Sequence, residues 1–149
     1  KILELAGSGK DFNTVVNETS RHIADMTTLF VLEDLDHLRK NGRLTGALAM
    51  VTSALKIKLL CHATPEGEIG KIGQALSVKQ ALSKMVARIA ADPGHQGKLL
   101  TLVHCNNVER AIYVKDLLVK SCRFRDILIS DARGITTVYA NDGGIIVAY

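Results

Sequence analysis

Two stretches of the chain place apolar residues at the spacing of one helix face. From residue 11 to about 24, apolar positions recur at helical spacing and follow Asp11, which can act as an N-cap. Residues 78–89 repeat the pattern with basic side chains on the opposite face, and Asp92-Pro93-Gly94 follows as a stop signal. We therefore predict two amphipathic helices.

A third helix is predicted between two apolar strands. The runs KLLTLVHC at residues 98–105 and RDILIS at residues 125–130 favour buried strands. Between them, Asn106 with Glu109 three residues later resembles a capping box, which opens a helix that reaches about Ser121. A strand, a helix and a strand in this order predict a right-handed β-α-β unit with parallel strands.

Other segments favour strands outside this unit. Residues 27–34 are rich in β-branched and aromatic side chains, and an apolar run closes the chain at 145–149 after a glycine-rich turn. Residues 56–64 alternate in part between apolar and polar positions, and Pro65-Glu66-Gly67 provides a turn into residues 68–76, which predicts a hairpin. Together, these elements predict an α+β fold, a mixed β-sheet covered by helices.

The segment DLDHLRKNGRLTGALAMVTSAL, residues 34–55, changes character in its middle. It begins as a short helix with acids at its start and bases at its end, and Gly42 suits a left-handed C′ position. Arg43 follows, and residues 44–55 then carry no charge. We predict a helix there whose small and apolar residues either belong to the core or leave a groove for an apolar ligand.

The composition limits the class of protein. A length of 149 residues suits one domain, and 47% hydrophobic against 23% charged residues exclude a disordered chain. No uncharged apolar run reaches the roughly 18 to 20 residues of a membrane span. Three cysteines without C-x-x-C spacing indicate a reducing compartment, the cytoplasm. The chain starts at Lys1 without a signal peptide, so we expect it to be cut from a longer one.

Chemistries that depend on a recognisable motif are unsupported. The net charge of +4 is scattered, and three Phe, three Tyr and no Trp argue against nucleic-acid binding. The histidines lack metal-ligand spacing, and no glycine-rich phosphate motif occurs. His104 and Cys105 are neighbours on a strand, so their side chains point to opposite faces and do not form a nucleophile pair. We expect no enzyme, no cofactor and no metal.

Arg43 is the first candidate for a functional side chain. A guanidinium at a helix end beside an apolar helix can hold a carboxylate or a phosphate by two parallel hydrogen bonds. In the alternative, structural interpretation, it caps carbonyl groups or pairs with an acid such as Asp34 or Asp36. The residues alone leave both interpretations open.

The words DLDHLRKNGRLTGA, LKIKLL, VKQAL and TVYANDGGIIVAY, in this order, resemble the C-terminal domain of the DegV family of fatty-acid-binding proteins. The resemblance covers nearly the whole chain, residues 1–149, and the Gly42-Arg43 step is its most specific match. It implies a bacterial, cytoplasmic carrier that holds a long-chain fatty acid in an apolar tunnel. It further implies a partner fatty-acid kinase, and an N-terminal domain with head-group contacts that this sequence lacks.

The resemblance assigns residues one by one. Arg43 falls on the arginine of the Gly-Arg step, on the head-group side. Leu76 stands where the family has an arginine ahead of its basic helix, and Tyr139 where it has the histidine of its H-x-G-P-G turn, with Asn141 and Asp142 replacing the glycine and proline. These departures argue against acyl-phosphate formation, although the Tyr139 hydroxyl can still hydrogen-bond a head group. The residues expected to contact lipid are Arg43, Thr45, Ala47, Met50, Val51, Ile57, Leu76, Tyr139 and Asn141.

Two hypotheses for the function remain. In the first, the chain is a carrier domain that binds a long-chain fatty acid or a similar lipid in an apolar tunnel. In the second, it is a non-enzymatic interaction or regulatory domain with a filled core that has lost head-group binding. They differ in whether an elongated apolar cavity opens beside residues 44–55.

Overall fold

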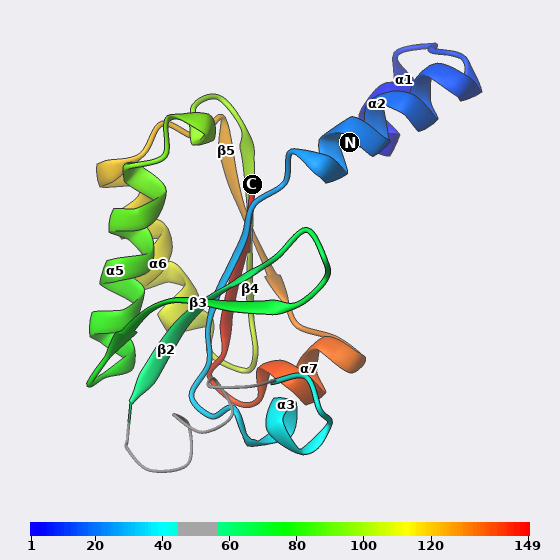
Figure 1. Cartoon of the computed structure of the whole chain (residues 1–149). Helices are drawn as coiled ribbons and strands as arrows, with labels where there is room; N and C mark the ends of the chain where they lie inside the picture. Colours follow the sequence, from blue (N-terminus) through cyan, green and yellow to red (C-terminus); the bar gives the residue numbers. More distant parts are fainter. Residues whose placement is uncertain (45–56) are drawn as a thin grey trace.

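A mixed β-sheet lies at the centre of the chain (Figure 1). The computed structural model describes residues 1–44 and 57–149, and within them six strands form one sheet in the order β3-β2-β1-β6-β4-β5. β4 and β5 are parallel, and the other neighbouring strands are antiparallel. The strands are β1 Thr28–Val31, β2 Lys58–Ala63, β3 Ile69–Ala75, β4 Leu99–His104, β5 Asp126–Asp131 and β6 Ile145–Ala148.

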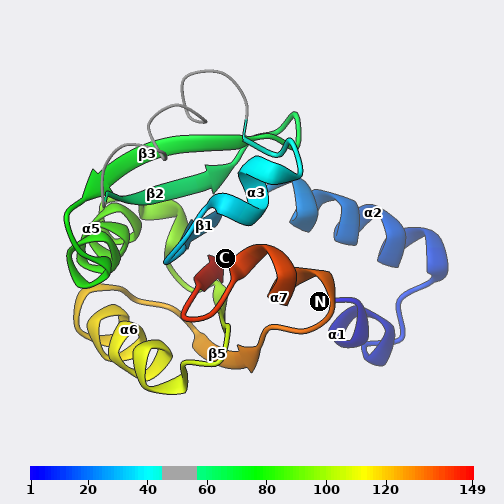
Figure 2. The same cartoon turned by 90° about the horizontal axis from the view of Figure 1, so that it is seen from below.

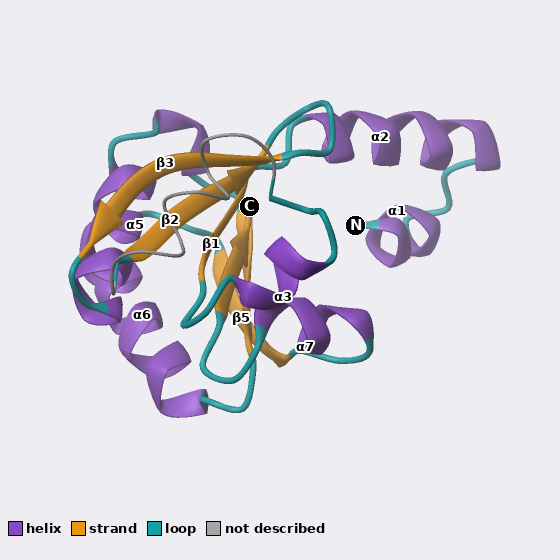
Figure 3. Ribbon diagram, turned by 60° about the horizontal axis from the view of Figure 1, so that its bottom comes forward, coloured by secondary structure: helices purple, strands orange, loops and turns teal. Residues whose placement is uncertain are grey.

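The described helices lie on both faces of the sheet and differ in length between them. The long helices α5 and α6 lie along one face, whereas the short helices α3 and α7 lie side by side at one end of the other face (Figures 2 and 3). The helices are α1 Ile2–Gly7, α2 Phe12–Ala24, α3 Asp36–Lys40, α5 Val78–Ala90, α6 Val108–Ser121 and α7 Ile135–Ala140, with a 3₁₀ turn at Pro93–His95. The predicted α+β fold, a mixed sheet covered by helices, is confirmed.

The strongly periodic segments form the predicted elements. α2 begins after Asp11, whose carboxylate accepts the N–H of Thr14 at 3.1 Å. The hairpin is present as antiparallel β2 and β3, and Gly67 in its turn has φ +80°. β4, α6 and β5 form the predicted parallel β-α-β unit. The uncharged helix predicted for residues 44–55 falls almost entirely outside the described residues.

The capping box predicted at Asn106 and Glu109 is wrong. The N-cap of α6 is Asn107, whose side-chain oxygen accepts the N–H of Arg110 at 3.0 Å. Asn106 has φ +51°, and its amide donates to Asp142 at 2.9 Å. The left-handed residue turns the chain before the helix starts, which moves the cap one position along.

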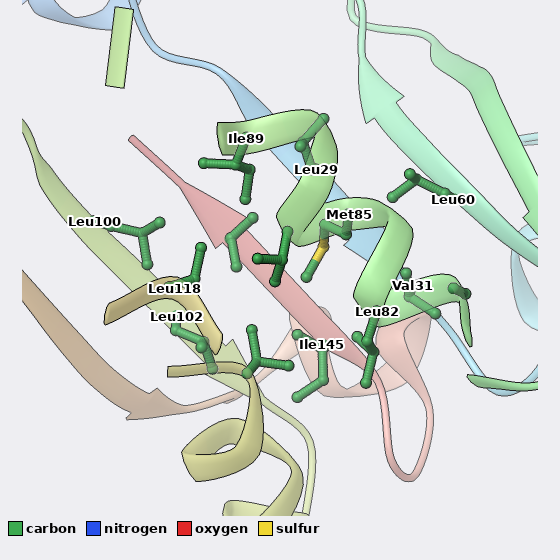
Figure 4. Close-up of a cluster of buried hydrophobic side chains, with 14 of the residues drawn as sticks. Leu29, Val31, Leu60, Leu82, Met85, Ile89, Leu100, Leu102, Leu118 and Ile145 are labelled. Atoms are coloured by element: carbon green, nitrogen blue, oxygen red, sulfur yellow. The ribbon is translucent and has the colours of Figure 1, made fainter. Parts of the chain in front are cut away.

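The main core lies between the sheet and the two long helices (Figure 4). Leu29 and Val31 of β1 point into it, whereas Phe30 between them points to the opposite face. β6 alternates in the same way, with Ile145 in the main core and Ile146 on the other side. The central strands are therefore apolar on both faces, which explains their continuous apolar runs.

α1 and α2 form an arm that projects away from the sheet (Figure 1). α2 buries none of its side chains, and its apolar residues Phe12 and Ile23 are 79% and 60% exposed. The helical spacing of these apolar residues was correctly predicted from the sequence. The apolar face that they form remains exposed in the described part of the chain. Within that part of the chain, no helix is long and apolar enough to cross a membrane.

The main core supplies a direct test of the fold. Met85 of α5 is fully buried against the sheet. Met85→Ala should lower the free energy of unfolding by about 2–5 kcal/mol, because it removes apolar contacts and leaves a cavity. Ser83→Ala, on the exposed face of the same helix, should change it by less than about 0.5 kcal/mol. Urea unfolding measures both, and equal effects would contradict the described packing.

Candidate functional site

A second apolar cluster occupies the face of the sheet opposite α5 and α6. We call it the α3–α7 cluster, because these two helices contribute to it together with β2 and the end of β4. Its buried members are Leu32, Leu35, Leu38, Leu44, Leu59, Cys61, Cys105 and Ala140, and Phe30, Ile57, Ile69, Ala132, Tyr139 and Ile146 pack against it partly buried.

Two of the residues predicted to contact lipid pack against the α3–α7 cluster. Ile57 and Tyr139 pack against it, and Asn141 is the C-cap residue of α7. Arg43 is exposed and directly precedes the buried Leu44. The predicted contacts Thr45, Ala47, Met50 and Val51 lie outside the described residues. The described part of the candidate site is thus one end of an apolar surface with polar residues at its edge.

Leu76 takes a different place from Tyr139. It is 84% exposed and lines a cleft of about 490 Å³ at the ends of β1 and β3 and the start of α5. Ile57 and Leu59 line the same cleft, so it borders the α3–α7 cluster. Glu33 and Lys58 are its charged walls.

The end of α3 shows why Arg43 is exposed. The N–H of Arg43 donates to the carbonyl of Leu38 at 2.8 Å, and that of Gly42 donates to Arg39 at 3.1 Å. With φ +67° at Gly42, this is a Schellman motif, so the predicted left-handed C′ glycine is confirmed. The backbone of Arg43 caps the helix, and its guanidinium has no part in the motif.

The acids proposed as structural partners of Arg43 have other contacts. Asp36 lies 3.2 Å from the guanidinium of Arg39, and Asp34 accepts the N–H of Asp36 at 2.7 Å. Among the described residues, no ion pair joins Arg43 to an acid. Within the described part of the chain, neither Asp34 nor Asp36 therefore pairs with Arg43, which is exposed.

The turn from Asn141 to Gly144 is fastened to the end of β4. Gly143 donates its N–H to the carbonyl of Cys105 at 2.8 Å, and the N–H of Cys105 donates to Gly144 at 3.0 Å. Gly143 has φ +79°, and a Cβ there would lie 2.7 Å from the guanidinium of Arg110. The positive φ favours glycine at this position, and a side chain there would also require the end of Arg110 to move.

An ion cluster that the sequence did not predict lies behind this turn. Arg110 donates to the Glu33 carboxylate at 2.7 Å and to the carbonyl of Gly143. Lys58 donates to the other Glu33 oxygen at 2.8 Å and to the Glu33 carbonyl at 2.6 Å. Burial alone would raise the pKa of Glu33, but the hydrogen bonds and charges of Lys58 and Arg110 outweigh it and hold the pKa below its ordinary value of 4.5.

His104 and Cys105 face opposite sides of the sheet, as predicted. The buried His104 lies 3.3 Å from a carboxylate oxygen of Asp131 and accepts the N–H of Asn107 on its other ring nitrogen. Cys105 belongs to the α3–α7 cluster, where burial raises the pKa of its thiol. Burial also raises the pKa of Cys61 to about 12. Both thiols are therefore neutral packing residues at physiological pH.

The Glu33 cluster should make folding stability depend on acid pH. Because the pKa of Glu33 is lower in the folded state, its contribution is complete above its ordinary value of 4.5 and is lost as pH falls through the folded value. Glu33→Gln should therefore cost about 1–2 kcal/mol at pH 7 and progressively less below pH 4.5. Urea unfolding across pH measures this difference. The exposed Glu68→Gln is the control, and a pH-independent difference for Glu33→Gln would contradict the cluster.

The sequence and the fold of this chain match those of a known protein family. The sequence model of the DegV family, described as uncharacterised proteins, matches residues 1–149. A DegV family protein from Ruminococcus gnavus, whose crystal structure was refined with vaccenic acid, is 43% identical. It superimposes with a TM-score of 0.90 over 100% of this chain and 53% of its own.

Two streptococcal proteins extend the comparison. A DegV domain-containing protein from Streptococcus gordonii is 28% identical over 149 residues, which are 100% of this chain and 53% of the relative. The Streptococcus pneumoniae Fatty Acid Kinase (Fak) B3 protein, loaded with linoleic acid, is 22% identical with a TM-score of 0.86 over 99% of this chain and 52% of its own, and this likeness concerns the fold alone. The chain thus spans about half the length of its relatives, and because the family model matches all of its residues, it belongs to the DegV family.

Proposed function

We propose that this chain binds a long-chain fatty acid as a non-enzymatic carrier domain, with the acyl chain against the α3–α7 cluster. The observation that carries the proposal is the likeness, over the whole chain, to the R. gnavus protein refined with vaccenic acid. A DegV protein from Streptococcus agalactiae, 25% identical with a TM-score of 0.82, is also described as fatty-acid-binding. These relatives are bacterial, and we propose the bacterial cytoplasm as the location.

The α3–α7 cluster offers the physical basis for acyl-chain binding. Phe30, Ile57 and Ile146 are apolar but only partly buried there, so they have surface left to cover. Burying an acyl chain is favourable by roughly 0.8 kcal/mol per CH₂ group. An acyl chain that covers this face would therefore gain substantial binding free energy.

Arg43 supplies the charge that the other end of a fatty acid requires. A carboxylate removed from water without a partner is strongly unfavourable, so an apolar site for a fatty acid works only with a cation or donors at its mouth. Arg43 stands at the edge of the α3–α7 cluster, next to the buried Leu44, and its guanidinium is not used in the helix cap. We assign it to the carboxylate.

We propose a division of labour with the rest of a DegV protein. The described chain supplies an apolar wall and Arg43, and the remaining half of the protein supplies hydroxyl and backbone contacts to the head group. The share of the relatives that this chain covers, 53%, supports such a second half. The fatty acid is the proposed ligand, and a fatty-acid kinase is the proposed partner.

The role of Arg43 can be separated from folding. A long-chain fatty acid should raise the melting temperature of the chain, since a ligand that binds the folded state stabilises it. Arg43→Ala should weaken fatty-acid binding by about 1.5 to 3 kcal/mol and binding of the matching alcohol far less, because only the acid carries the charge. Thermal shift and calorimetry measure both effects.

Matched controls sharpen this test. Arg39→Ala removes a neighbouring exposed guanidinium that pairs with Asp36, and it should leave the affinity unchanged. The melting temperature of lipid-free Arg43→Ala should equal that of the unmodified chain, because the cap uses only backbone atoms. No thermal shift at saturating, sub-micellar lipid would favour a filled-core interaction domain.

Leu76 and Tyr139 test whether the chain presents its lipid for phosphorylation. They replace an arginine and a histidine of the family pattern, so a chimera with this chain in place of the corresponding half of the S. pneumoniae Fak B3 protein should form no acyl phosphate with a fatty-acid kinase. Introducing Leu76→Arg with Tyr139→His should increase turnover. The parent protein is the positive control, and robust turnover by the unmodified chimera would disprove this assignment.

A further inference from the structure

We propose that Arg110 is a positioning residue for the head group of the bound lipid. It acts through the turn from Asn141 to Gly144, which it holds in place, and makes no contact with the ligand itself. This inference rests on the proposed function, because it concerns how the same site distinguishes a carboxylate from an uncharged head group.

Arg110 joins the turn to Glu33, and we call this pair of contacts the clamp. One end of its guanidinium donates to the carbonyl of Gly143, and the other lies 2.7 Å from Glu33. Lys58 holds the second oxygen of Glu33 at 2.8 Å, so the acid that orients Arg110 is itself fixed. Both ends of the Arg110 guanidinium are already hydrogen-bonded, to Glu33 and to Gly143, which makes it a poor candidate for direct carboxylate binding.

The clamp joins four segments that are distant in sequence. Glu33 lies between β1 and α3, Lys58 begins β2, Arg110 is in the first turn of α6, and Gly143 lies between α7 and β6. Glu33 and Arg110 are 77 positions apart, and Glu33 and Lys58 are 25 apart. The cluster therefore adds contacts from three further segments to the backbone hydrogen bonds with Cys105 that fasten the turn to the end of β4.

The position of the turn determines the position of Tyr139 and Asn141. α7 is only six residues long, and Asn141 follows it with φ +56°. A helix this short has little stability of its own, so its orientation depends on what holds its ends. The Gly143 carbonyl is one of the points where it is held.

This arrangement predicts a selective effect on the head group. A hydroxyl or amide that hydrogen-bonds a carboxylate must lie within about 2.6–3.2 Å of it, whereas apolar contacts with the acyl chain tolerate small displacements. Releasing the turn should therefore weaken recognition of the acid more than binding of the chain. Loss of general packing would weaken both together.

The experiment compares vaccenic acid with the corresponding alcohol. Arg110→Met keeps an unbranched apolar stem at this position and removes the charge and the donors of the guanidinium. We expect the ratio of alcohol to acid dissociation constants to fall about tenfold, with the alcohol affinity changed by less than about twofold. For Arg110→Lys, which retains one donor group, this ratio should lie between that of the unmodified chain and that of Arg110→Met. Arg125→Met is the control, because Arg125 contacts only the exposed Glu4 at 3.6 Å among the described acids.

An unchanged ratio in Arg110→Met, or an equal loss of affinity for both lipids, would overturn the proposal. Glu33→Ala gives a second route if Arg110→Met does not fold, since it removes both oxygens that orient the guanidinium and the amine of Lys58. The same decrease of the ratio is then expected, and an unchanged ratio again overturns it.

Amide hydrogen exchange separates this inference from the proposed function. The N–H of Gly143, bonded to Cys105, should exchange at least tenfold faster in Arg110→Met than in the unmodified chain, with the main core unchanged. If the unmodified chain binds neither lipid, the proposed function fails, and the exchange rate alone decides the role of Arg110. Unchanged exchange at Gly143 would show that the clamp does not hold the turn.

Discussion

Burial of the central strands on both faces is the constraint on which the structure depends. β1 and β6 are only four residues long, yet their side chains alternate between two separate apolar clusters. The main core meets this requirement with α5 and α6, which are 13 and 14 residues long. On the opposite face, the helices that the structure describes are α3 and α7, of only five and six residues.

Because the helices on that face are short, hydrogen bonds at their ends are needed to hold them in place. An isolated helix of five or six residues is not stable in water, so tertiary contacts must fix it. α3 is closed by the backbone motif at Gly42, and α7 leads into the turn that Cys105, Asn106 and Arg110 hold. The polar residues at the edge of the α3–α7 cluster thus have structural reasons for their positions as well as proposed functional ones.

The parts of the fold that could be predicted are those encoded locally. The helical spacing in residues 78–89, the turn at Gly67 and the cap at Asp11 each depend on residues close in sequence. α7 was not predicted, because Thr136, Thr137 and Val138 are β-branched and favour strands, and only tertiary context makes them helical.

The candidate site was predicted in part for the same reason. Arg43 and Tyr139 could be singled out, because they stand in recognisable words of the sequence. The Glu33 cluster could not, since its partners lie 25 and 77 positions away and no local pattern links them. The position of Leu76, in a cleft apart from Tyr139, likewise depends on how the hairpin crosses the sheet.

The projecting arm formed by α1 and α2 influences which part of the chain unfolds first. Because α2 buries none of its side chains, its helical hydrogen bonds are supported by few contacts beyond α1. We therefore expect α2 to unfold locally at a lower free energy than the strands of the sheet. This exposes residues 12–24 to proteolysis ahead of the strands, and the exposed apolar face of α2 favours unspecific association between copies.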